Sequence, residues 1–439
     1  MAGFLGLIAA GTVVLTLPAA SASGVGTGML PALFTATSAV TLTGLAVVDT
    51  GSHWSGLGQV TVLSLIQLGG FGIMSLTSLA GMLLTGRIGL RSRLFARAEN
   101  RSLNTGDIGR TLISTLLITV ICEAVVASVT AVRFMMSYGM SAPRAGWEGL
   151  FHAVSAFNNA GFGLRSDSLV PYVGDAWIIL PLATALVLGG LGFPVISELW
   201  NRVRDRVRRR SRRGMGRLSV TTRVTVVGTG VLIVLGVTMV TILEWDNTLA
   251  GLPVGTRLLA GFFQGITPRT AGFNSLDYGE FHPTTLMGTD LLMFIGGGSA
   301  GTAGGIKITT AAVLLAAIVA EVRGQRVTTI GHRTVSQPVV RQALTVAVVS
   351  VMLVVVAVGA LRLLDPGFTS DQVTFEAVSA FATVGLSTGI TADLSSPSQV
   401  VLCVLMYLGR IGPVTLVVAL AARNSARRFD YPEERPFIG

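Results

Sequence analysis

Long apolar stretches recur along the chain, separated by short polar or glycine-rich segments. Eight stretches are long enough to cross a bilayer as helices, for which about 20 residues suffice. They lie at 3–20, 56–84, 111–135, 176–198, 223–243, 286–320, 342–363 and 398–422, and the sixth is interrupted by glycines. The first stretch lacks the cationic start of a signal peptide, so we expect it to be the first spanning helix.

Between the members of each pair of stretches lies a shorter segment in which a phenylalanine precedes a glycine by ten residues. The pairs are Phe34/Gly44, Phe151/Gly161, Phe262/Gly272 and Phe375/Gly385, and successive glycines are 117, 111 and 113 residues apart. One unit of span, re-entrant segment and span is therefore repeated four times. We predict an all-α integral membrane fold with eight spanning helices and four re-entrant segments, in a pseudo-fourfold arrangement about one axis. The units are 1–86, 87–205, 206–322 and 323–439, and a cytoplasmic link opens each of the last three.

Composition and charge placement support this topology. The chain is 51% hydrophobic and 12% charged, which is too apolar for a soluble protein of 439 residues. Its net charge of +10 is concentrated after the second span of each unit, with six arginines in 87–110, ten in 201–223, four in 323–341 and three in 423–428. This is the positive-inside pattern, and it predicts a multi-pass protein of the cell membrane with both termini in the cytoplasm. The arginines thus report topology and not nucleic-acid binding, and the acidic opposite loops predict a vestibule that attracts cations.

The four re-entrant segments are too short to span, so we expect half-crossing helices that point their carbonyl ends at a common cavity. A glycine after each helix permits the positive φ angles that turn carbonyls toward an axis. No ring of carboxylates is available, so backbone oxygens would replace the hydration shell of K⁺, or of Rb⁺, and not of Ca²⁺ or Mg²⁺. The alternative is that these are ordinary packing glycines. The predicted potassium filter comprises Leu42, Thr43, Gly44, Asn159, Ala160, Gly161, Thr270, Ala271, Gly272, Thr383, Val384 and Gly385.

Glycines also cluster in the second spans, beginning at Gly69, Gly189, Gly296 and Gly409, where they would let helices approach closely or bend. The third cluster is too rich in glycine for a regular helix. We predict a broken helix whose middle is an intramembrane gating loop; a rigid unwound segment is the alternative. The predicted gating residues are Gly296, Gly297, Gly298, Ser299, Ala300, Gly301, Thr302, Ala303, Gly304, Gly305, Lys307 and Arg410.

The same glycine-rich segment matches two enzyme patterns, which its setting disfavours. G-x-S-x-G around Ser299 is a nucleophile-elbow pattern, but no histidine in the sequence is placed to activate it. G-x-G-x-x-G at 296–301 lacks the βαβ setting of a dinucleotide site. We therefore expect no catalytic residues and no enzyme activity.

Two cations lie within predicted spans. Arg410 stands mid-span where the first two units have glycine, and it would either face the pore and repel cations or clamp a helix end. Lys307 would cap the broken helix or extend to the cytoplasmic interface.

Four other residues attract attention for their chemistry. Arg269, three residues before Gly272, is expected to support the filter from behind, paired with Glu376 or another outer acid. Glu123 is expected to be a packed or paired carboxylate, with a proton relay as the alternative. Cys122 and Cys403 lie inside predicted spans, where they favour apolar packing over a disulfide or metal site.

Three segments resemble a known family: TPRTAGFNS at 267–275, the glycine-rich segment at 296–310, and the ending YPEERPFIG at 431–439. They resemble the membrane subunit of Ktr-type bacterial potassium uptake systems, within the Trk/Ktr/HKT superfamily, and the likeness extends over essentially the whole chain. A Trk-type subunit is less similar, since it usually has two more N-terminal spans.

The resemblance implies a homodimer in which each chain encloses its own pore. It also implies a cytoplasmic ring of nucleotide-binding (RCK-type) regulatory subunits that binds ATP or ADP, so the nucleotide would not bind this chain. It further implies that the loop of the third unit gates, that Arg410 contributes to the barrier, and that the C-terminal tail reaches the dimer partner. In plant relatives a serine at the first filter glycine accompanies sodium transport, so Gly44 favours K⁺.

Together these observations predict channel-like potassium uptake, driven by the membrane potential and regulated by a cytoplasmic partner. An alternating-access secondary transporter would require inverted repeats, whereas these units run in one order. An intramembrane serine hydrolase built on Ser299 is the third hypothesis. The arginine-dense link at 202–213 has no assigned role.

Overall fold

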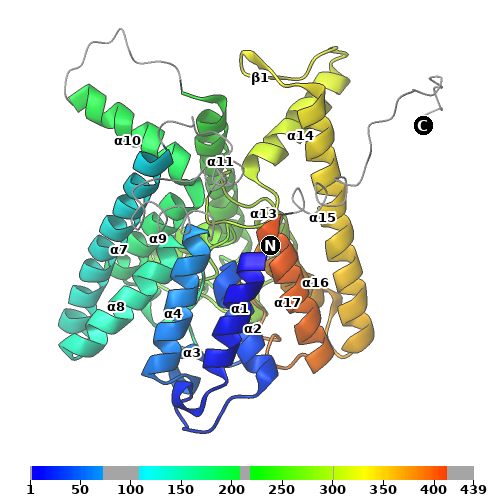
Figure 1. Ribbon diagram of the computed structural model, residues 1–439. Helices are drawn as coiled ribbons and strands as arrows, with labels where there is room; N and C mark the ends of the chain where they lie inside the picture. Colours follow the sequence, from blue (N-terminus) through cyan, green and yellow to red (C-terminus); the bar gives the residue numbers. More distant parts are fainter. Residues whose placement is uncertain (1, 73–107, 208–217, 300, 413–439) are drawn as a thin grey trace.

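The computed structural model describes residues 2–72, 108–207, 218–299 and 301–412, and their secondary structure is mostly helical, as predicted (Figure 1). Within them, one two-stranded antiparallel hairpin pairs β1 (Thr329–Ile330) with β2 (Arg333–Thr334). Three of the described helices are long and apolar enough to cross a membrane, and a bent pair could be a fourth. The sequence predicted eight spanning stretches with the sixth interrupted; in the structure several of them are divided into shorter helices or lie partly outside the described residues.

The helices form four units, each with a first helix, a short helix and a second helix. The first unit is α1 (Ala2–Leu15), α2 (Met29–Thr41) and α4 (Gly56–Phe71), and the second is α7 (Ile108–Tyr138), α8 (Ala142–Phe157) and α9 (Ala176–Leu191) with α10 (Phe193–Val207). The third is α11 (Val220–Leu243), α12 (Val254–Ile266) and α13 (Pro283–Phe294) with α14 (Ile308–Val322), and the fourth is α15 (Gln337–Leu364), α16 (Ser370–Ala382) and α17 (Ser396–Ile411). Single turns η1 (Pro18–Ala20), α3 (Thr50–His53), η2 (Val170–Tyr172) and η4 (Tyr278–Glu280) lie in the connections.

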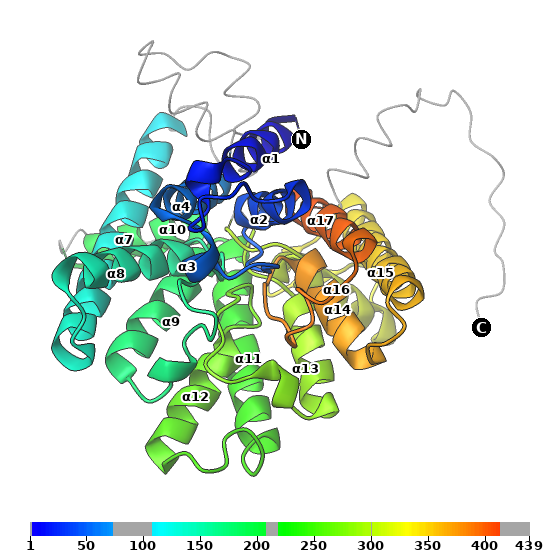
Figure 2. The ribbon, with the colours of Figure 1, turned by 90° about the horizontal axis from the view of Figure 1, so that it is seen from below.

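The four units close into a ring. Each second helix packs on the short helix of the next unit: α4 on α8, α9 on α12, and α13 on α16. The last second helix, α17, packs on the first short helix, α2. Figure 2 shows the units following one another around the molecule in chain order.

The described second helices all end at or next to their glycine clusters, where the sequence predicted close approach or bending and, in the third unit, a break. Helices α4, α9 and α17 end before Gly72, Gly192 and Gly412, with φ values of +68°, +88° and +81°. Past Gly192, α10 leaves α9 at 106°, so 176–198 is not one straight span. The predicted interruption of the third is confirmed, since α13 ends at Phe294 and α14 begins at Ile308. The remainder of the stretches 56–84 and 398–422 lies outside the described residues.

The phenylalanines of the repeat anchor the short helices in the core, with one change of register. Phe34, Phe151 and Phe375 are fully buried, ten residues before their glycines. In the third unit the fully buried residue is Phe263, nine residues before Gly272, while Phe262 is only half-buried. The third unit is therefore shorter by one residue, and Phe262 is not the structural equivalent of the other three.

Candidate functional site

The four repeat glycines lie together at the centre of the ring. A Cβ on Gly44 would lie 3.0 Å from the Cα of Gly161, and a Cβ on Gly161 would lie 2.8 Å from the Cα of Gly272. A Cβ on Gly272 would contact the Val384 carbonyl, and a Cβ on Gly385 would lie 2.9 Å from the Cα of Gly44. The contacts thus run through all four segments and return to the first. Glycine is required at each position, because φ is +92°, +70°, +74° and +89° in turn and no space exists for a side chain.

The residue before each glycine contributes a carbonyl to the same ring. A Cβ on Gly44 would lie 2.5 Å from the Ala160 oxygen, and a Cβ on Gly161 would lie 3.2 Å from the Ala271 oxygen. At Gly272 and Gly385, a Cβ would contact the oxygens of Val384 and Thr43. Each segment therefore brings a peptide oxygen next to the glycine of a neighbouring segment.

Two residues before each glycine, the backbone is left-handed again although the residue is not glycine. The φ angles are +60° at Leu42, +55° at Asn159, +71° at Thr270 and +50° at Thr383. This conformation costs a non-glycine residue roughly 1–2 kcal/mol, and it recurs at the same position in all four segments. A strained geometry repeated four times indicates a shape that the tertiary structure enforces.

Hydrogen bonds to the ends of the short helices hold the N–H groups of these segments away from the ring. The N–H groups of Thr43, Ala160 and Val384 donate to the carbonyls of Ser38, Ser155 and Ser379 at 2.8–2.9 Å. In the shorter third unit, the Ala271 N–H donates to the Thr267 carbonyl at 2.9 Å. Because the donors are occupied on the helix side, the peptide oxygens are the groups left for the central space.

The residue after each buried phenylalanine is polar, and in the third and fourth units it supports the chain that follows the glycine, a feature that the sequence reasoning missed. The buried Glu376 carboxylate accepts from the Thr388 N–H at 3.2 Å, the Thr391 hydroxyl at 2.9 Å and the Ser387 hydroxyl. In the third unit, Gln264 accepts from the Ser275 N–H at 3.1 Å. The signal was present in the sequence, because Thr35, His152, Gln264 and Glu376 are polar residues at one position of the repeat.

Arg269 does not pair with Glu376, so that expected pairing is wrong. The Glu376 oxygens are occupied by its own unit, and the guanidinium of Arg269, 6% exposed, makes no salt bridge to any residue that the structure describes. Its Nε and Nη2 lack hydrogen-bond partners among the described atoms. Arg269 nevertheless lies directly before the left-handed Thr270, whose hydroxyl donates to the Arg269 carbonyl at 2.6 Å.

Glu123 belongs to a buried amide network behind the second segment. Its two oxygens accept from Asn158 Nδ2 at 3.1 Å and from Gln67 Nε2 at 3.3 Å, and Asn158 Nδ2 also lies 2.9 Å from Gln67 Oε1. The Asn158 side chain fills the place where Gly70 would carry a Cβ. The expectation of a packed and partnered carboxylate is therefore met, and the network links the first unit to the second.

A cavity of about 300 Å³ opens on one side of the glycine ring. It is lined by the four glycines and by the residues that follow them, including Asp49, Arg165, Ser387 and Thr391. The expected acidic vestibule is not matched at this cavity, whose lining includes one carboxylate and one guanidinium. Outer acids serve elsewhere: Asp175 pairs with Arg133 at 2.7 Å, and Glu244 accepts from the His282 N–H at 3.0 Å.

The glycine-rich segment between α13 and α14 crosses the opposite side of the ring. The Gly298 N–H donates to the Gly190 carbonyl at 2.8 Å, and the Thr302 hydroxyl donates to the Gly189 carbonyl at 3.3 Å. Gly304 packs against Thr383 and Ala382, so the segment joins the second unit to the base of the fourth. Gly296–Gly298 and Thr302–Gly305 are buried, and Ala300 lies outside the described residues.

Three side chains fasten this segment. Arg410 donates through Nη1 to the Thr302 carbonyl and through Nη2 to the Gly69 carbonyl at 2.8 Å. Lys307 precedes α14 and donates back to the Ala303 carbonyl. The Ser299 hydroxyl lies 2.6 Å from that of Thr309, a partner that is no general base. Arg410 therefore ties the glycine-rich segment to the second helix of the first unit.

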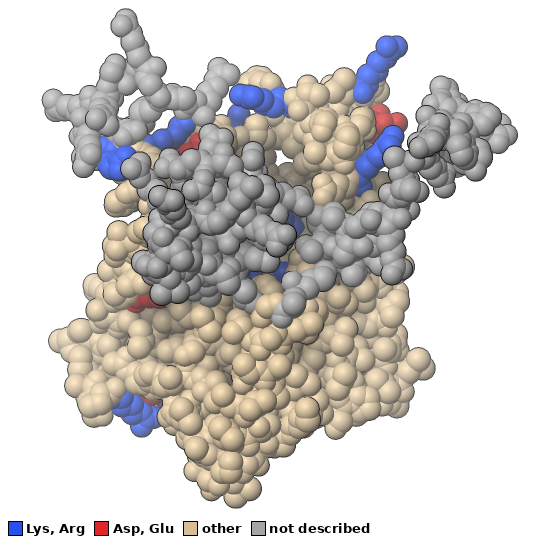
Figure 3. All heavy atoms as spheres, viewed as in Figure 1, with Lys and Arg blue, Asp and Glu red and all other residues tan. Residues whose placement is uncertain are grey.

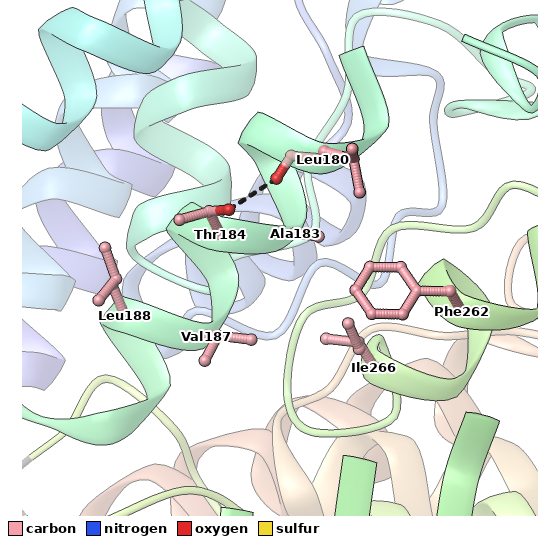
Figure 4. A pocket seen from close by; sticks show the side chains of 7 residues that line it. All are labelled: Leu180, Ala183, Thr184, Val187, Leu188, Phe262 and Ile266. Carbon is pink, nitrogen blue, oxygen red and sulfur yellow. Dashed lines mark hydrogen bonds between the residues drawn. The ribbon is translucent and has the colours of Figure 1, made fainter. Parts of the chain in front are cut away.

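A second, apolar groove lies between α9 and α12, away from the ring (Figure 4). It has a volume of about 230 Å³ and is lined by Leu180, Ala183, Thr184, Val187, Leu188, Phe262 and Ile266. Its one hydroxyl, on Thr184, donates to the Leu180 carbonyl at 2.8 Å, so the groove presents no free polar group for ion chemistry.

Comparison with known proteins places the whole chain in one family. The family described as TrkH, cation transport protein, matches residues 2–431. The chain is 39% identical to the Ktr system potassium uptake protein B of Bacillus subtilis over 441 residues, covering 100% of this chain and 95% of that protein. It is 38% identical to the protein of the same name from Vibrio alginolyticus, covering 99% and 93%. The crystal structure of the potassium transporter TrkH from Vibrio parahaemolyticus shares the fold, with a TM-score of 0.69 at 18% identity, covering 95% of this chain and 84% of that one.

Proposed function

The chain belongs to the TrkH family of cation transport proteins, and we propose that it is the potassium-conducting membrane subunit of a Ktr-type uptake system. The names of its two full-length relatives, both potassium uptake proteins of Ktr systems, support this assignment. Because this is a family of cation transport proteins, we assign the chain no enzymatic role.

The observation that carries the proposal is the closed ring of glycines and peptide oxygens at the ends of four short helices. The carbonyl end of a helix carries about half a negative charge, and four such ends favour a cation between them. Neutral peptide oxygens replace the weakly held water of K⁺ better than the tightly held water of a divalent ion. The proposed filter consists of the twelve residues at 42–44, 159–161, 270–272 and 383–385.

The gate in this proposal is the glycine-rich segment with Lys307 and Arg410. Its described residues bond to the second unit, pack on the fourth and are tied by Arg410 to the first, so the segment lies across the route that an ion would take beyond the filter. Two cationic side chains at that level raise the electrostatic barrier to K⁺. Movement of the segment would remove both the obstruction and the charge.

Regulation and assembly complete the proposal. A Ktr system has more than one component, and this supports the presence of a cytoplasmic regulatory partner. In the proposal ATP or ADP binds that partner and not this chain. We place two copies of the chain in the assembly, with the pore inside each copy and both termini in the cytoplasm. Inward flux then needs no covalent step, since each charge gains about 2.3 kcal/mol per 100 mV of membrane potential.

The decisive experiment is ⁸⁶Rb⁺ uptake by vesicles that contain only this purified chain, driven by an imposed inside-negative potential. We expect uptake that unlabelled K⁺ suppresses and that Na⁺ suppresses only at much higher concentration. Equal competition by Na⁺ and K⁺ would remove the potassium assignment. Uptake that persists without a potential and follows a coupled ion gradient would favour a secondary transporter.

A further inference from the structure

Helix α10 turns sharply away from the helix that precedes it. The angle between α9 and α10 is 106°, and the turn occurs at Gly192, where φ is +88°. A helix at this angle does not continue the direction of α9, and where α9 crosses the bilayer α10 would run close to the membrane plane. Figure 1 shows α10 at the end of the molecule where α14 and the β1–β2 hairpin also lie.

One face of α10 is packed and the opposite face presents a large aromatic residue. Val195 is fully buried, whereas Trp200 is 62% exposed and Val203 is 58% exposed. Residues three apart lie on one side of a helix, so Trp200 and Val203 share a face. Arg204 on the same turn is exposed, and Arg202 is half-buried.

A carboxylate fixes the orientation of α10. Glu198 accepts from the Ser219 N–H and hydroxyl, each at 2.9 Å, and from the Thr222 hydroxyl at 2.5 Å. These donors are at the start of α11, so α10 is tied to the next unit and its outer face is held in place. The exposure of Trp200 is therefore a property of the fold.

The sequence that begins in the last turns of α10 is rich in arginine. The sequence 201–223 contains ten arginines and one acidic residue, Asp205. Figure 3 shows Lys and Arg side chains at the same end of the molecule. Within α10, Arg202, Arg204 and Arg206 outnumber Glu198 and Asp205 by one, and all three arginines lie toward its C-terminal end. Arginines beside an aromatic and an aliphatic side chain on an outer face are typical of helices that bind at the surface of anionic membranes.

We propose that α10 is an interfacial helix that binds anionic phospholipid headgroups of the cytoplasmic leaflet. Trp200 and Val203 would enter the headgroup boundary, where tryptophan is favoured, and Arg202 and Arg204 would meet the lipid phosphates. The proposal rests on the membrane orientation given under the proposed function. Of the arginine-rich link at 202–213, the proposal concerns Arg202 and Arg204, which lie in α10.

The position of α10 gives such a lipid site access to the gating segment. The Gly298 N–H bonds to the Gly190 carbonyl, two residues before the hinge. A Cβ on Gly301 would lie 3.3 Å from the backbone N and Cα of Gly192 itself. Headgroups bound to α10 would therefore act on the segment of backbone on which the gating residues rest.

The test places a fluorophore on the outer face of α10. Val203→Cys is introduced with Cys122→Ala and Cys403→Ala, labelled with an environment-sensitive dye, and reconstituted into vesicles. The vesicles contain phosphatidylcholine alone or phosphatidylcholine with phosphatidylglycerol, and a phosphatidylcholine with a nitroxide near the headgroup quenches dyes at the interface. A label at the exposed Gln325, introduced as Gln325→Cys on the link after α14, is the control for general proximity to the membrane.

We expect quenching at position 203 that increases with phosphatidylglycerol and is lost in about 1 M salt, where charges are screened beyond about 3 Å. Arg202→Gln with Arg204→Gln should weaken the apparent affinity for phosphatidylglycerol by about thirtyfold, since each basic residue near the surface contributes about a factor of five. Arg323→Gln with Arg326→Gln, which removes two exposed arginines elsewhere on the same side, should leave the affinity unchanged. Trp200→Ala should reduce quenching, and Trp177→Ala at the other end of α9 should not.

Quenching that is equal with and without phosphatidylglycerol would overturn the proposal, as would quenching that is weak under all conditions. A label protected only by a cytoplasmic partner protein would assign α10 to that partner and would also overturn it. Rb⁺ uptake measured in the same vesicles reports the transport function separately, so either proposal can fail without the other.

Discussion

Replacing Gly44 with serine tests the glycine ring most directly. At Gly44 φ is +92°, and a Cβ would lie 2.5 Å from the Ala160 oxygen and 3.0 Å from the Cα of Gly161. The left-handed backbone costs a residue with a Cβ roughly 1–2 kcal/mol, and steric overlap in a packed interior costs about 1–3 kcal/mol. The sum of about 2–5 kcal/mol can be relieved only by moving the backbone of the second segment away from the ring.

That movement should change ion selection more than it changes folding. If the strain reduces the free-energy difference by which the filter favours K⁺ over Na⁺ by about 1.4 kcal/mol, the K⁺/Na⁺ permeability ratio falls about tenfold. The assay is ⁸⁶Rb⁺ uptake with competing K⁺ or Na⁺ in vesicles, after size-exclusion chromatography has shown that the variant is folded. A folded variant with an unchanged ratio would refute the assignment of Gly44 to the filter.

Two control substitutions separate the sources of strain. Gly24→Ser introduces a side chain at a φ of +71° with nothing within 4 Å, so it tests backbone strain alone. Gly230→Ser in α11 has ordinary backbone geometry and open space, so it tests the added hydroxyl alone. Neither should alter the permeability ratio.

Further predictions concern the gate and the supporting residues. Deletion of residues 299–304 should raise Rb⁺ flux through the isolated chain, and low flux in a folded deletion variant would remove the segment as the barrier. Arg410→Ala should raise flux more weakly, whereas the exposed Arg326→Ala should not, and lower flux in folded Arg410→Ala would favour a purely structural clamp. Glu376→Ala leaves the Thr388 N–H without its acceptor, at a cost of about 1–3 kcal/mol. The Rb⁺ concentration for half-maximal uptake should therefore be higher in this variant than in the control variant Glu321→Ala, which changes an exposed residue. Equal concentrations in the two variants would exclude a supporting role for Glu376. Glu123→Ala should lower the unfolding temperature by removing two buried acceptors, a shift that differential scanning fluorimetry measures and that Glu321→Ala should not produce.

Much of the candidate site was accessible from the sequence because it is repeated. Hydropathy and the recurrence of glycine predicted the helical fold, the interruption in the third unit and the residues that the structure brings together at 44, 161, 272 and 385. The polar residue after each buried phenylalanine was equally visible, but its role in the third and fourth units depends on partners eleven or more residues away, such as Ser275 for Gln264 and Thr388 for Glu376. The permeation role of these residues stays a prediction until flux is measured.

The sequence by itself therefore determined the composition of each unit. The lengths of the apolar stretches, the positions of the glycines and the placement of the arginines are local properties that can be recognised without knowing which residues meet in the fold. The tertiary structure decided the order of contacts around the ring, the bend at Gly192, the one-residue register change that buries Phe263, and the partners of Arg410. These depend on distances between residues more than a hundred positions apart or on competition between neighbouring side chains for one buried place. Which side chain is buried depends on the packing in three dimensions, because a change of a few tenths of an ångström in an interatomic distance can make or break a hydrogen bond or create a steric overlap.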